Sequence, residues 1–422
     1  MAKVPPRTDA IAARLPRQAR LHAVAPAGIV AAPSTAKGRD MTAPPPITPI
    51  TYLTTILFEH GALAALPGEI KALGIARPLL VTDRGVVAAG IAGRVLALLP
   101  QANAMPRFED TPSNPTEQAV SKALALYRQG DCDGIVAVGG GSSMDLAKAV
   151  AVLATHPGQL AEYMMMLGGV ARITPAVAPV IAIPTTAGTG SEVGRGALIT
   201  LADGRKMGLV SPYLIPRRAI CDPDLTLGLP AGLTAATGMD ALTHCIETFI
   251  SPRVNPPAEA IALDGAQRAA RWIERATSDG SDREARWNMM MASMMGAMAF
   301  QKGLGAVHGM SHPLGALKSP VLHHGTLNAV ILPAVLRYNS GHVGDKYARL
   351  RATLGLPAGY DLAEWIEGLN ARLKLPAGLR AMGVDEALIP KLSEEAVKDH
   401  CTPTNPRPVG RAEYETLFHQ AM

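Results

Sequence analysis

The stretch GIVAVGGGSSMDLAK, residues 134–148, decides how the first half of this chain folds. The apolar run Gly134–Val138 predicts a buried strand, and Ser142–Ala154 predicts a helix that follows three consecutive glycines. Backbone N–H groups at the positive end of such a helix can bind a phosphate with no side chains in the way. The stretch therefore favours a strand, a phosphate-binding loop and a helix, and the alternative is a glycine-rich turn used only for tight packing.

Apolar runs and helical stretches alternate around this segment. Arg77–Asp83 and Val180–Ile183 predict further strands, and Gly85–Leu99 predicts a helix between them. Such alternation is typical of a parallel sheet with helices on its faces. The runs Ala197–Leu201 and Lys206–Ser211, separated by a short turn, predict a β-hairpin.

The amino-acid composition of the chain changes after about Leu229. Long segments rich in Ala, Met, Leu and Arg follow, and Pro230 and Pro257 mark helix starts, so this half is expected to be all-helical. The methionines of Met289–Met298 are interpreted as core packing. A cleft between an α/β and a helical domain is a usual place for a small-molecule site. We expect three parts: a disordered or wrongly assigned N-terminal extension at 1–47, an α/β domain at 48–228 and a helical domain at 229–422.

Charge and cysteine content narrow the class of protein. The net charge is +5, but residues 1–40 hold seven Lys or Arg against two Asp, so the remainder sums to zero. A neutral body offers little attraction for nucleic acid. No apolar run reaches the roughly 18 residues needed to span a membrane. The four scattered cysteines form no CxxC pair, which predicts buried thiols in the reducing cytoplasm.

Two more strand ends strengthen the nucleotide hypothesis. Asp83 ends one strand, where a carboxylate can accept hydrogen bonds from ribose hydroxyls, and PTTAGTGSE at Pro184–Glu192 supplies hydroxyls and glycines at another. Three strand ends that face one crevice favour a dinucleotide. The glycine spacing is not GxGxxG, so an ordinary Rossmann fingerprint does not fit.

A second set of residues is suited to a divalent metal. In GMDALTHCIE, residues 238–247, Asp240 and His244 stand four apart and project from one helix face. The stretch VHGMSHPLGALKSPVLHHG, residues 307–325, adds His308, His312 and His324 as candidates that could close the shell. Spacing alone pairs His308 with His312. Pro313 argues against that pair, because the residue before a proline is pushed out of the helical region, which predicts a break at His312.

Four motifs and their order carry a resemblance to a known family. GGGSSMDLAK, IPTTAGTGSEV, ATGMDALTHCIE and GLGAVHGMSHPLGA, together with CTPTNPR at 401–407, resemble the signatures of the iron-containing (type III) alcohol dehydrogenases. The resemblance extends from about Thr54 to the C-terminus and is closest to the lactaldehyde and short-chain alcohol branch. It implies an α/β N-terminal Rossmann-like domain, an all-α C-terminal domain as in dehydroquinate synthase, and NAD(P)-linked interconversion of alcohols with aldehydes or ketones.

The resemblance also assigns roles to single residues. Asp240, His244, His308 and His324 match the family's metal ligands, with His323 as an alternative to its neighbour His324. His312 matches the position near nicotinamide and substrate that is thought to relay protons. The resemblance implies Fe²⁺, whereas the donor set alone is compatible with Zn²⁺, Mn²⁺, Co²⁺ or Ni²⁺ as well. The positions that match nucleotide contacts are Asp83, Asn114, Gly139, Gly140, Gly141, Ser142, Ser143, Asp145, Thr185, Thr186, Thr189 and Lys206.

The expected activity is the NAD- and metal-dependent oxidation of a small alcohol. NAD is preferred over NADP because the carboxylate of Asp83 would repel a 2′-phosphate. Alternatives within the family are maleylacetate reductase and hydroxyacid-oxoacid transhydrogenase. A lyase like dehydroquinate synthase is the rival from another reaction class, but its metal shell centres on a Glu with two His, whereas Asp240 stands here. Relatives are often dimers, so a homodimer or higher homo-oligomer is expected.

Overall fold

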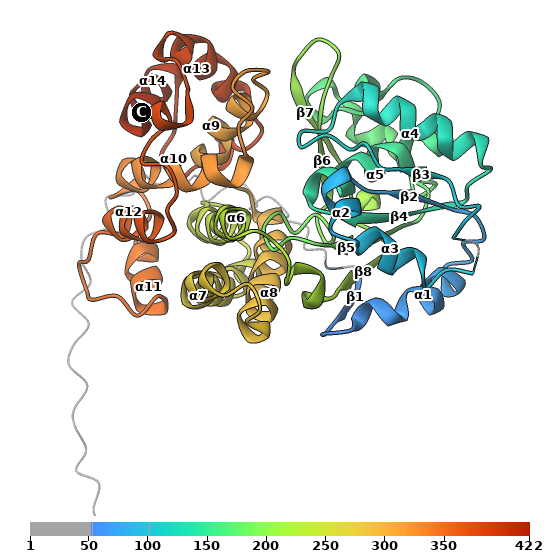
Figure 1. Cartoon of the computed structure of the whole chain (residues 1–422). Coiled ribbons are helices and arrows are strands. Elements are labelled where there is room, and N and C mark those ends of the chain that lie inside the picture. The colour runs from blue at the N-terminus through green and yellow to red at the C-terminus, as the bar shows by residue number, and fades with distance from the viewer. Residues whose placement is uncertain (1–51, 53, 101) are drawn as a thin grey trace, which may run out of the picture. The chain divides into compact units, whose positions relative to one another are not determined.

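The computed structural model describes Tyr52, residues 54–100 and residues 102–422. The prediction for residues 1–47 therefore lies outside the described residues. Six strands form one parallel sheet, and two more form an antiparallel hairpin (Figure 1). The sheet has the order β1 (Thr55–Phe58), β8 (Arg218–Cys221), β5 (Val180–Pro184), β4 (Gly134–Gly139), β2 (Pro78–Val81) and β3 (Arg107–Phe108), and the hairpin pairs β6 (Gly196–Thr200) with β7 (Lys206–Val210).

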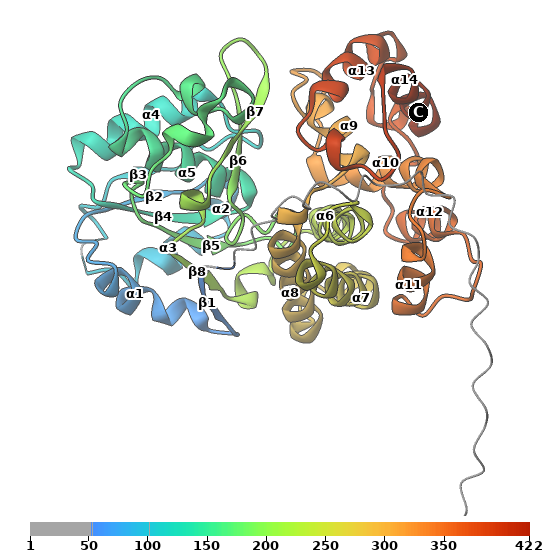
Figure 2. The same cartoon turned by 180° about the vertical axis from the view of Figure 1, so that it is seen from behind.

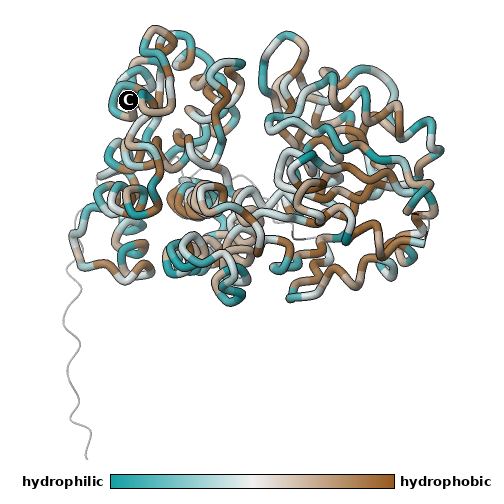
Figure 3. The backbone as a smooth tube through the Cα atoms, viewed as in Figure 1, coloured by the Kyte–Doolittle hydropathy of each residue, from teal (hydrophilic) through white to brown (hydrophobic). Residues whose placement is uncertain are grey.

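Successive side chains of each strand point to opposite faces of the sheet, and helices cover both faces. In β4, Ile135 and Ala137 join one apolar cluster, whereas Val136 and Val138 join another. Figure 3 shows hydrophobic segments at the centre of this sheet. The first cluster is completed by α4 (Glu117–Gln129) and α5 (Gly141–Thr155), and the second by α1 (Leu66–Ala72), α2 (Arg84–Ala88) and α3 (Ile91–Leu96).

Most predicted elements of this half are confirmed. The strands appear as β2, β4 and β5, the helix after the glycines as α5, and the hairpin as β6 and β7. The single helix predicted at Gly85–Leu99 was wrong, because the chain forms α2 and α3 instead. Gly90 separates them with a φ of 74°, a left-handed conformation that a continuous helix does not accommodate.

Helices and short turns follow β8 in the described part of the chain, as predicted. The helices are α6 (Ala231–Ile250), α7 (Pro256–Ser278), α8 (Arg283–Ala299), α9 (Ala306–Gly315), α10 (His324–Asn339), α11 (Lys346–Thr353), α12 (Leu362–Arg372), α13 (Ile389–Lys398) and α14 (Arg411–Ala421). Both views show α6–α14 grouped apart from the sheet (Figure 2). Pro230 caps α6 and Pro257 lies in the first turn of α7, as predicted. The domain boundary placed after residue 228 stays a prediction.

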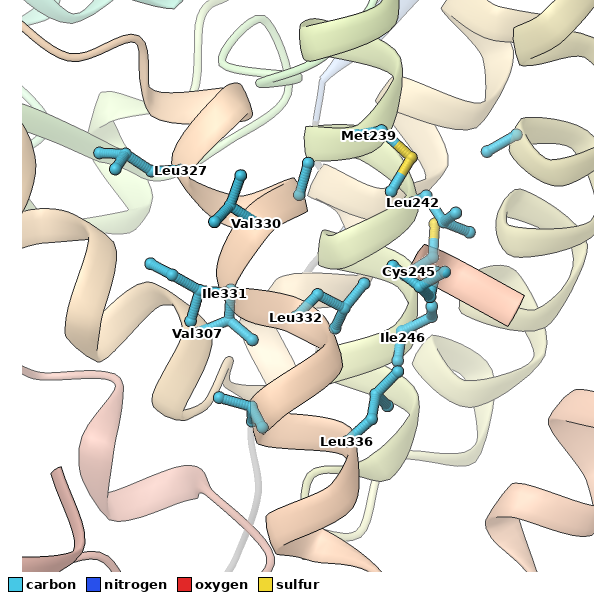
Figure 4. Packing of buried hydrophobic residues seen from close by; sticks show 14 of the residues in the cluster. Met239, Leu242, Cys245, Ile246, Val307, Leu327, Val330, Ile331, Leu332 and Leu336 are labelled. Carbon is cyan, nitrogen blue, oxygen red and sulfur yellow. The ribbon is translucent and has the colours of Figure 1, made fainter. Parts of the chain in front are cut away.

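The helices that carry the candidate metal ligands pack against one another. Met239 and Leu242 of α6, Val307 of α9, and Leu332 and Leu336 of α10 belong to one buried cluster (Figure 4). Met289, Met290 and Met294 of α8 lie in the same cluster, which confirms that these methionines are core residues. Close packing of this kind holds side chains on facing helices in fixed positions.

The cysteines and the helix lengths agree with the sequence analysis. All four cysteines are buried and free, and Cys245 packs in the helical core. Among the described residues, no helix is both long enough and apolar enough to cross a membrane.

Candidate functional site

The glycine loop leaves the N-terminus of α5 bare. Gly139 adopts a φ of 151°, which side chains rarely tolerate, and a Cβ on Gly141 would lie 2.7 Å from the Oγ1 atom of Thr189. Only glycine fits here without displacing its neighbours. The exposed backbone N–H groups and the helix dipole are therefore available to an anion such as a pyrophosphate.

Asp83 lies at the end of a strand beside the glycine loop, and Lys206 and Asn114 contact each other. Asp83 follows β2, accepts a hydrogen bond from the Val86 backbone N–H at 3.0 Å, and receives the hydroxyl of Ser143 at 3.3 Å. Since β2 and β4 pair in parallel, this carboxylate adjoins the glycine loop. Lys206 on β7 donates to Asn114 Oδ1 at 2.8 Å, and burial lowers the pKa of Lys206 to about 8.

The remaining predicted residues of this group contact the loop or secure it. The Thr185 N–H donates to the Gly139 carbonyl at 3.0 Å, and Thr186 Oγ1 lies 3.3 Å from where a Cβ of Gly140 would stand. The Ser142 hydroxyl donates to the Ser113 carbonyl at 2.5 Å. Both carboxylate oxygens of Asp145 are already occupied, by the Ser191 hydroxyl at 2.7 Å and the Leu198 N–H at 2.9 Å. Asp145 thus ties α5 to the hairpin.

Three candidate imidazole ligands lie around one carboxylate oxygen of Asp240. Asp240 Oδ1 lies 3.8 Å from His244 Nε2, 4.0 Å from His308 Nε2 and 3.7 Å from His324 Nε2. Bonds of about 2.0–2.2 Å to a tetrahedral metal would place ligand atoms about 3.4 Å apart. The separations from Asp240 exceed that value by only a few tenths of an ångström. The ligand atoms of Asp240, His244 and His308 lie within 4.8 Å of one another, and His324 joins this group through its approach to Asp240.

A carboxylate behind one imidazole supports this interpretation. Glu247 Oε2 lies 2.5 Å from His308 Nδ1, and Glu247 Oε1 accepts the Val307 N–H at 2.8 Å. Metal-bound histidines almost always give their second ring N–H to such an acceptor, which leaves Nε2 for the metal. Glu247 was not predicted from the sequence, although its spacing of seven from Asp240 on one helix places both on the same face.

Burial keeps two of the imidazoles neutral. It lowers the pKa of His244 to about 4 and that of His324 well below its ordinary value. Burial also opposes the charge on His308, but the hydrogen bond and negative charge of Glu247 outweigh it and raise the pKa. Neutral imidazoles that face a buried carboxylate form a donor set that fits a divalent metal.

Asn328 also reaches the centre of this cluster. Its Nδ2 atom lies 2.7 Å from Asp240 Oδ1, 3.2 Å from His308 Nε2 and 3.1 Å from His324 Nε2. Asn328 stands one helical turn after His324 on α10, so both project from the same face. Asn328 was not predicted as a site residue, although its spacing of four from His324 indicates that both lie on one helix face.

The predicted helix break at His312 was wrong. α9 continues through Pro313 to Gly315, because the proline lies in the last turn and nearly every residue of the helix is buried against its neighbours. His312 nevertheless has a different partner from His308. Its Nδ1 atom lies 2.8 Å from Asp399 Oδ2, a contact that the sequence did not suggest. His323 is exposed and bonds Thr326 at 3.3 Å, so the geometry favours its neighbour His324 as the ligand.

One cavity joins the nucleotide and metal candidates. It has a volume of about 300 Å³. Its lining includes predicted residues from the two groups, namely Asn114, Gly141, Ser142, Asp145, Thr189 and Lys206 with His244, His308, His312 and His324. A ligand bound at the tip of α5 can therefore extend to the imidazoles of α6, α9 and α10.

Replacing Glu247 with Gln tests the carboxylate behind His308. Glutamine has one acceptor oxygen and no charge, so it cannot accept the Val307 N–H and the His308 N–H together as the two carboxylate oxygens of Glu247 do. We therefore expect the affinity for Zn²⁺ or Fe²⁺ to fall about 10- to 100-fold. Competition against a chelator measures this affinity, and Glu364→Gln on α12 is the surface control. An unchanged affinity in Glu247→Gln would show that this carboxylate does not support a metal ligand.

The chain is similar to known proteins over most of its length. The family model described as iron-containing alcohol dehydrogenase matches residues 54–223, and the model of the C-terminal part of the same family matches residues 234–422. The chain is 58% identical over 380 residues to 4-hydroxybutyrate dehydrogenase of Cupriavidus necator. The aligned region covers 88% of this chain and 99% of that protein. It is 34% identical over 378 residues to lactaldehyde reductase of Escherichia coli K12, with coverage of 87% and 97%.

Solved structures give the same result. The crystal structure of 1,3-propanediol oxidoreductase matches with a TM-score of 0.83 and 37% identity, over 88% of this chain and 100% of that one. The structure of sulfoacetaldehyde reductase from Bifidobacterium kashiwanohense in complex with NAD⁺ matches with a TM-score of 0.80 and 28% identity, over 89% and 98%. Together with the two family models, which match most of the chain, these similarities confirm the predicted fold and resemblance. This chain belongs to the iron-containing alcohol dehydrogenase family and is an oxidoreductase.

Proposed function

We propose that this protein uses NAD and a divalent metal to interconvert a small primary alcohol and its aldehyde. The observation that carries the proposal is the single cavity shared by the glycine loop and the imidazoles of His244, His308 and His324. When bound, the metal would supply Lewis acidity at the hydroxyl oxygen and NAD would accept the hydride. Asp240 and these three histidines would hold the metal.

We assign proton transfer to His312. The hydrogen bond between His312 Nδ1 and Asp399 Oδ2 fixes the ring orientation and leaves Nε2 as the free acceptor. With NAD bound as the hydride acceptor, His312 would take the hydroxyl proton and pass it to water. One alcohol and one NAD⁺ thus give one aldehyde, one NADH and one proton.

We propose 4-hydroxybutyrate as the substrate, oxidised at its hydroxyl carbon to succinic semialdehyde. The support is the 58% identity to 4-hydroxybutyrate dehydrogenase, compared with 34% to lactaldehyde reductase. Iron is our choice of native metal on the family description, and zinc is the alternative that the donor set would accept. A homodimer or higher homo-oligomer remains our expectation, which light scattering tests.

The proposed activity is tested with protein reconstituted anaerobically in Fe²⁺ or Zn²⁺. NADH absorbance is followed with 4-hydroxybutyrate, 1,3-propanediol, short primary alcohols and 1,2-propanediol, which is the alcohol that corresponds to lactaldehyde. We expect NADH to form, with the highest kcat/KM for 4-hydroxybutyrate. Maleylacetate with NADH, and a hydroxyacid with an oxoacid, test the two family alternatives. If none of these substrates changes the NADH level and no hydroxyacid is converted at the expense of an oxoacid, the proposed alcohol oxidation fails and the lyase gains support.

Replacing Asp83 with Ser is expected to weaken the preference for NAD over NADP. Serine retains the cap on α2 but removes the negative charge that would repel a 2′-phosphate. We expect the ratio of kcat/KM values for NAD and NADP to fall at least about 10-fold, which corresponds to about 1.4 kcal/mol. Asp110→Ser, at the exposed partner of Arg84, is the control. A ratio unchanged in Asp83→Ser would remove this residue from the ribose site.

A further inference from the structure

Two arginines, Arg195 and Arg253, line the same cavity. Arg195 is half-buried just before β6, and Arg253 is exposed in the turn after α6. Within the described part of the chain, neither guanidinium has a hydrogen bond or an ion pair, whereas Arg218 pairs with Glu69 and Arg337 with Glu367. The two positive charges are left for an anion that enters the cavity.

The two arginines are close enough to influence each other. Burial lowers the pKa of Arg195, and the positive charge of Arg253 lowers it further. Repulsion between two cations is relieved when an anion binds between them. A carboxylate is suited to this place, because a guanidinium offers it paired N–H donors in one plane.

Contacts place Arg195 near the candidate metal ligands. A Cβ on Gly194, the preceding residue, would lie 3.0 Å from the Phe300 ring. The centre of the Phe300 ring lies 5.5 Å from that of His244. The backbone that carries Arg195 is therefore one aromatic ring away from the metal site.

The apolar part of the cavity lining suits a short hydrocarbon chain. Phe300 and Leu304 line the same cavity as Arg195, Arg253 and His312. Methylene groups of a substrate can pack against these apolar side chains while its two polar ends meet the imidazoles and the guanidinium groups.

We propose that Arg195 and Arg253 form a carboxylate-binding subsite, so that the enzyme selects short-chain ω-hydroxy acids over uncharged alcohols. The inference rests on the proposed function and deepens it by assigning the residues that recognise the end of the substrate away from the reacting hydroxyl. The glycine loop of α5, with Lys206 and Asn114 at the same cavity, would bind the pyrophosphate of NAD, so the two arginines are not needed for it.

Kinetics of Arg195→Gln, Arg253→Met and the double variant test the subsite in the metal-loaded enzyme. The substrates are 4-hydroxybutyrate, its uncharged amide and n-butanol. We expect kcat/KM for the acid to fall at least about 10-fold in each single variant and further in the double variant, while the two neutral substrates change less than about twofold. Arg253→Lys, which keeps the charge, is expected to restore part of the loss. Arg94→Met on α3 is the control.

Three kinetic results would overturn the subsite. They are an equal loss for the acid and its amide, a rise in KM for NAD without a change for the acid, and a wild-type enzyme that oxidises n-butanol as efficiently as 4-hydroxybutyrate. The first would indicate a structural role and the second a nucleotide contact.

Butyrate, which carries the carboxylate but no hydroxyl, tests the subsite without turnover. Calorimetry of butyrate against wild-type protein loaded with metal and NAD is expected to show binding that the double variant loses. If the wild-type protein binds butyrate in this way but oxidises no substrate, the subsite stands and the proposed activity fails. If butyrate binds equally to both proteins, or to neither, the subsite is refuted.

Discussion

Asp240→Ala is expected to lose the metal and with it the activity. Asp240 Oδ1 is the atom that lies within 4.0 Å of all three imidazole Nε2 atoms, so its removal takes away the one anionic ligand and leaves three neutral donors. We expect metal content near zero after dialysis. The loss of kcat/KM should exceed the roughly 100-fold that removal of an outer hydrogen bond to a ligand can cost.

Elemental analysis and kinetics of the same samples measure this effect. Asp264→Ala on α7, at the partly exposed partner of Arg268, is the matched control and should keep both metal and activity. Thermal unfolding of the variants separates metal loss from misfolding. A full complement of tightly bound metal in Asp240→Ala would show that the ion binds elsewhere.

His312→Ala is expected to keep the metal but lose turnover. His312 bonds Asp399 rather than Asp240, and its ring stacks on His324 at 5.6 Å between centres. Loss of a positioned proton acceptor costs about 10²- to 10⁴-fold in rate. We therefore expect a fall of that size in kcat with metal content unchanged.

Asp399→Asn refines this prediction. The amide can no longer accept the His312 N–H with a full negative charge, so the favoured tautomer and orientation of the ring are weakened. We expect kcat to fall in the same direction but less than in His312→Ala. His60→Ala, at a histidine that pairs with Asp224, is the control. Loss of metal in His312→Ala would instead make His312 a ligand.

Local signals in the sequence were sufficient for much of the fold. The run Gly134–Val138 was apolar throughout because β4 is buried on both faces, and Pro230 and Pro257 do stand at helix starts. Local signals were insufficient where tertiary packing overrides propensity. Pro313 predicted a break, yet burial of α9 on its neighbours carries the helix through it, and Gly90 breaks a segment that had looked continuous.

In the candidate site, too, local spacing predicted some contacts and tertiary packing determined the others. The spacing of Asp240 and His244 placed two ligand-type side chains on one helix face, and the structure does bring them to His308 and His324. Partners that are distant in sequence could not be read from spacing. Asp399 stands 87 positions from His312, and only the packing of α13 against α9 brings the loop that follows α13 to it.

The central claim is that Asp240 and three histidines hold one divalent metal beside the bound nucleotide. Anomalous diffraction from crystals of the protein loaded with Zn²⁺ and NAD⁺ tests it most directly. We predict a strong peak about 2.0–2.2 Å from Asp240 and from the Nε2 atoms of His244, His308 and His324. A second group of ligand-type side chains lies nearby, formed by His312, Asp399, His400 and Cys401. A peak at that group with none at Asp240 would contradict the account.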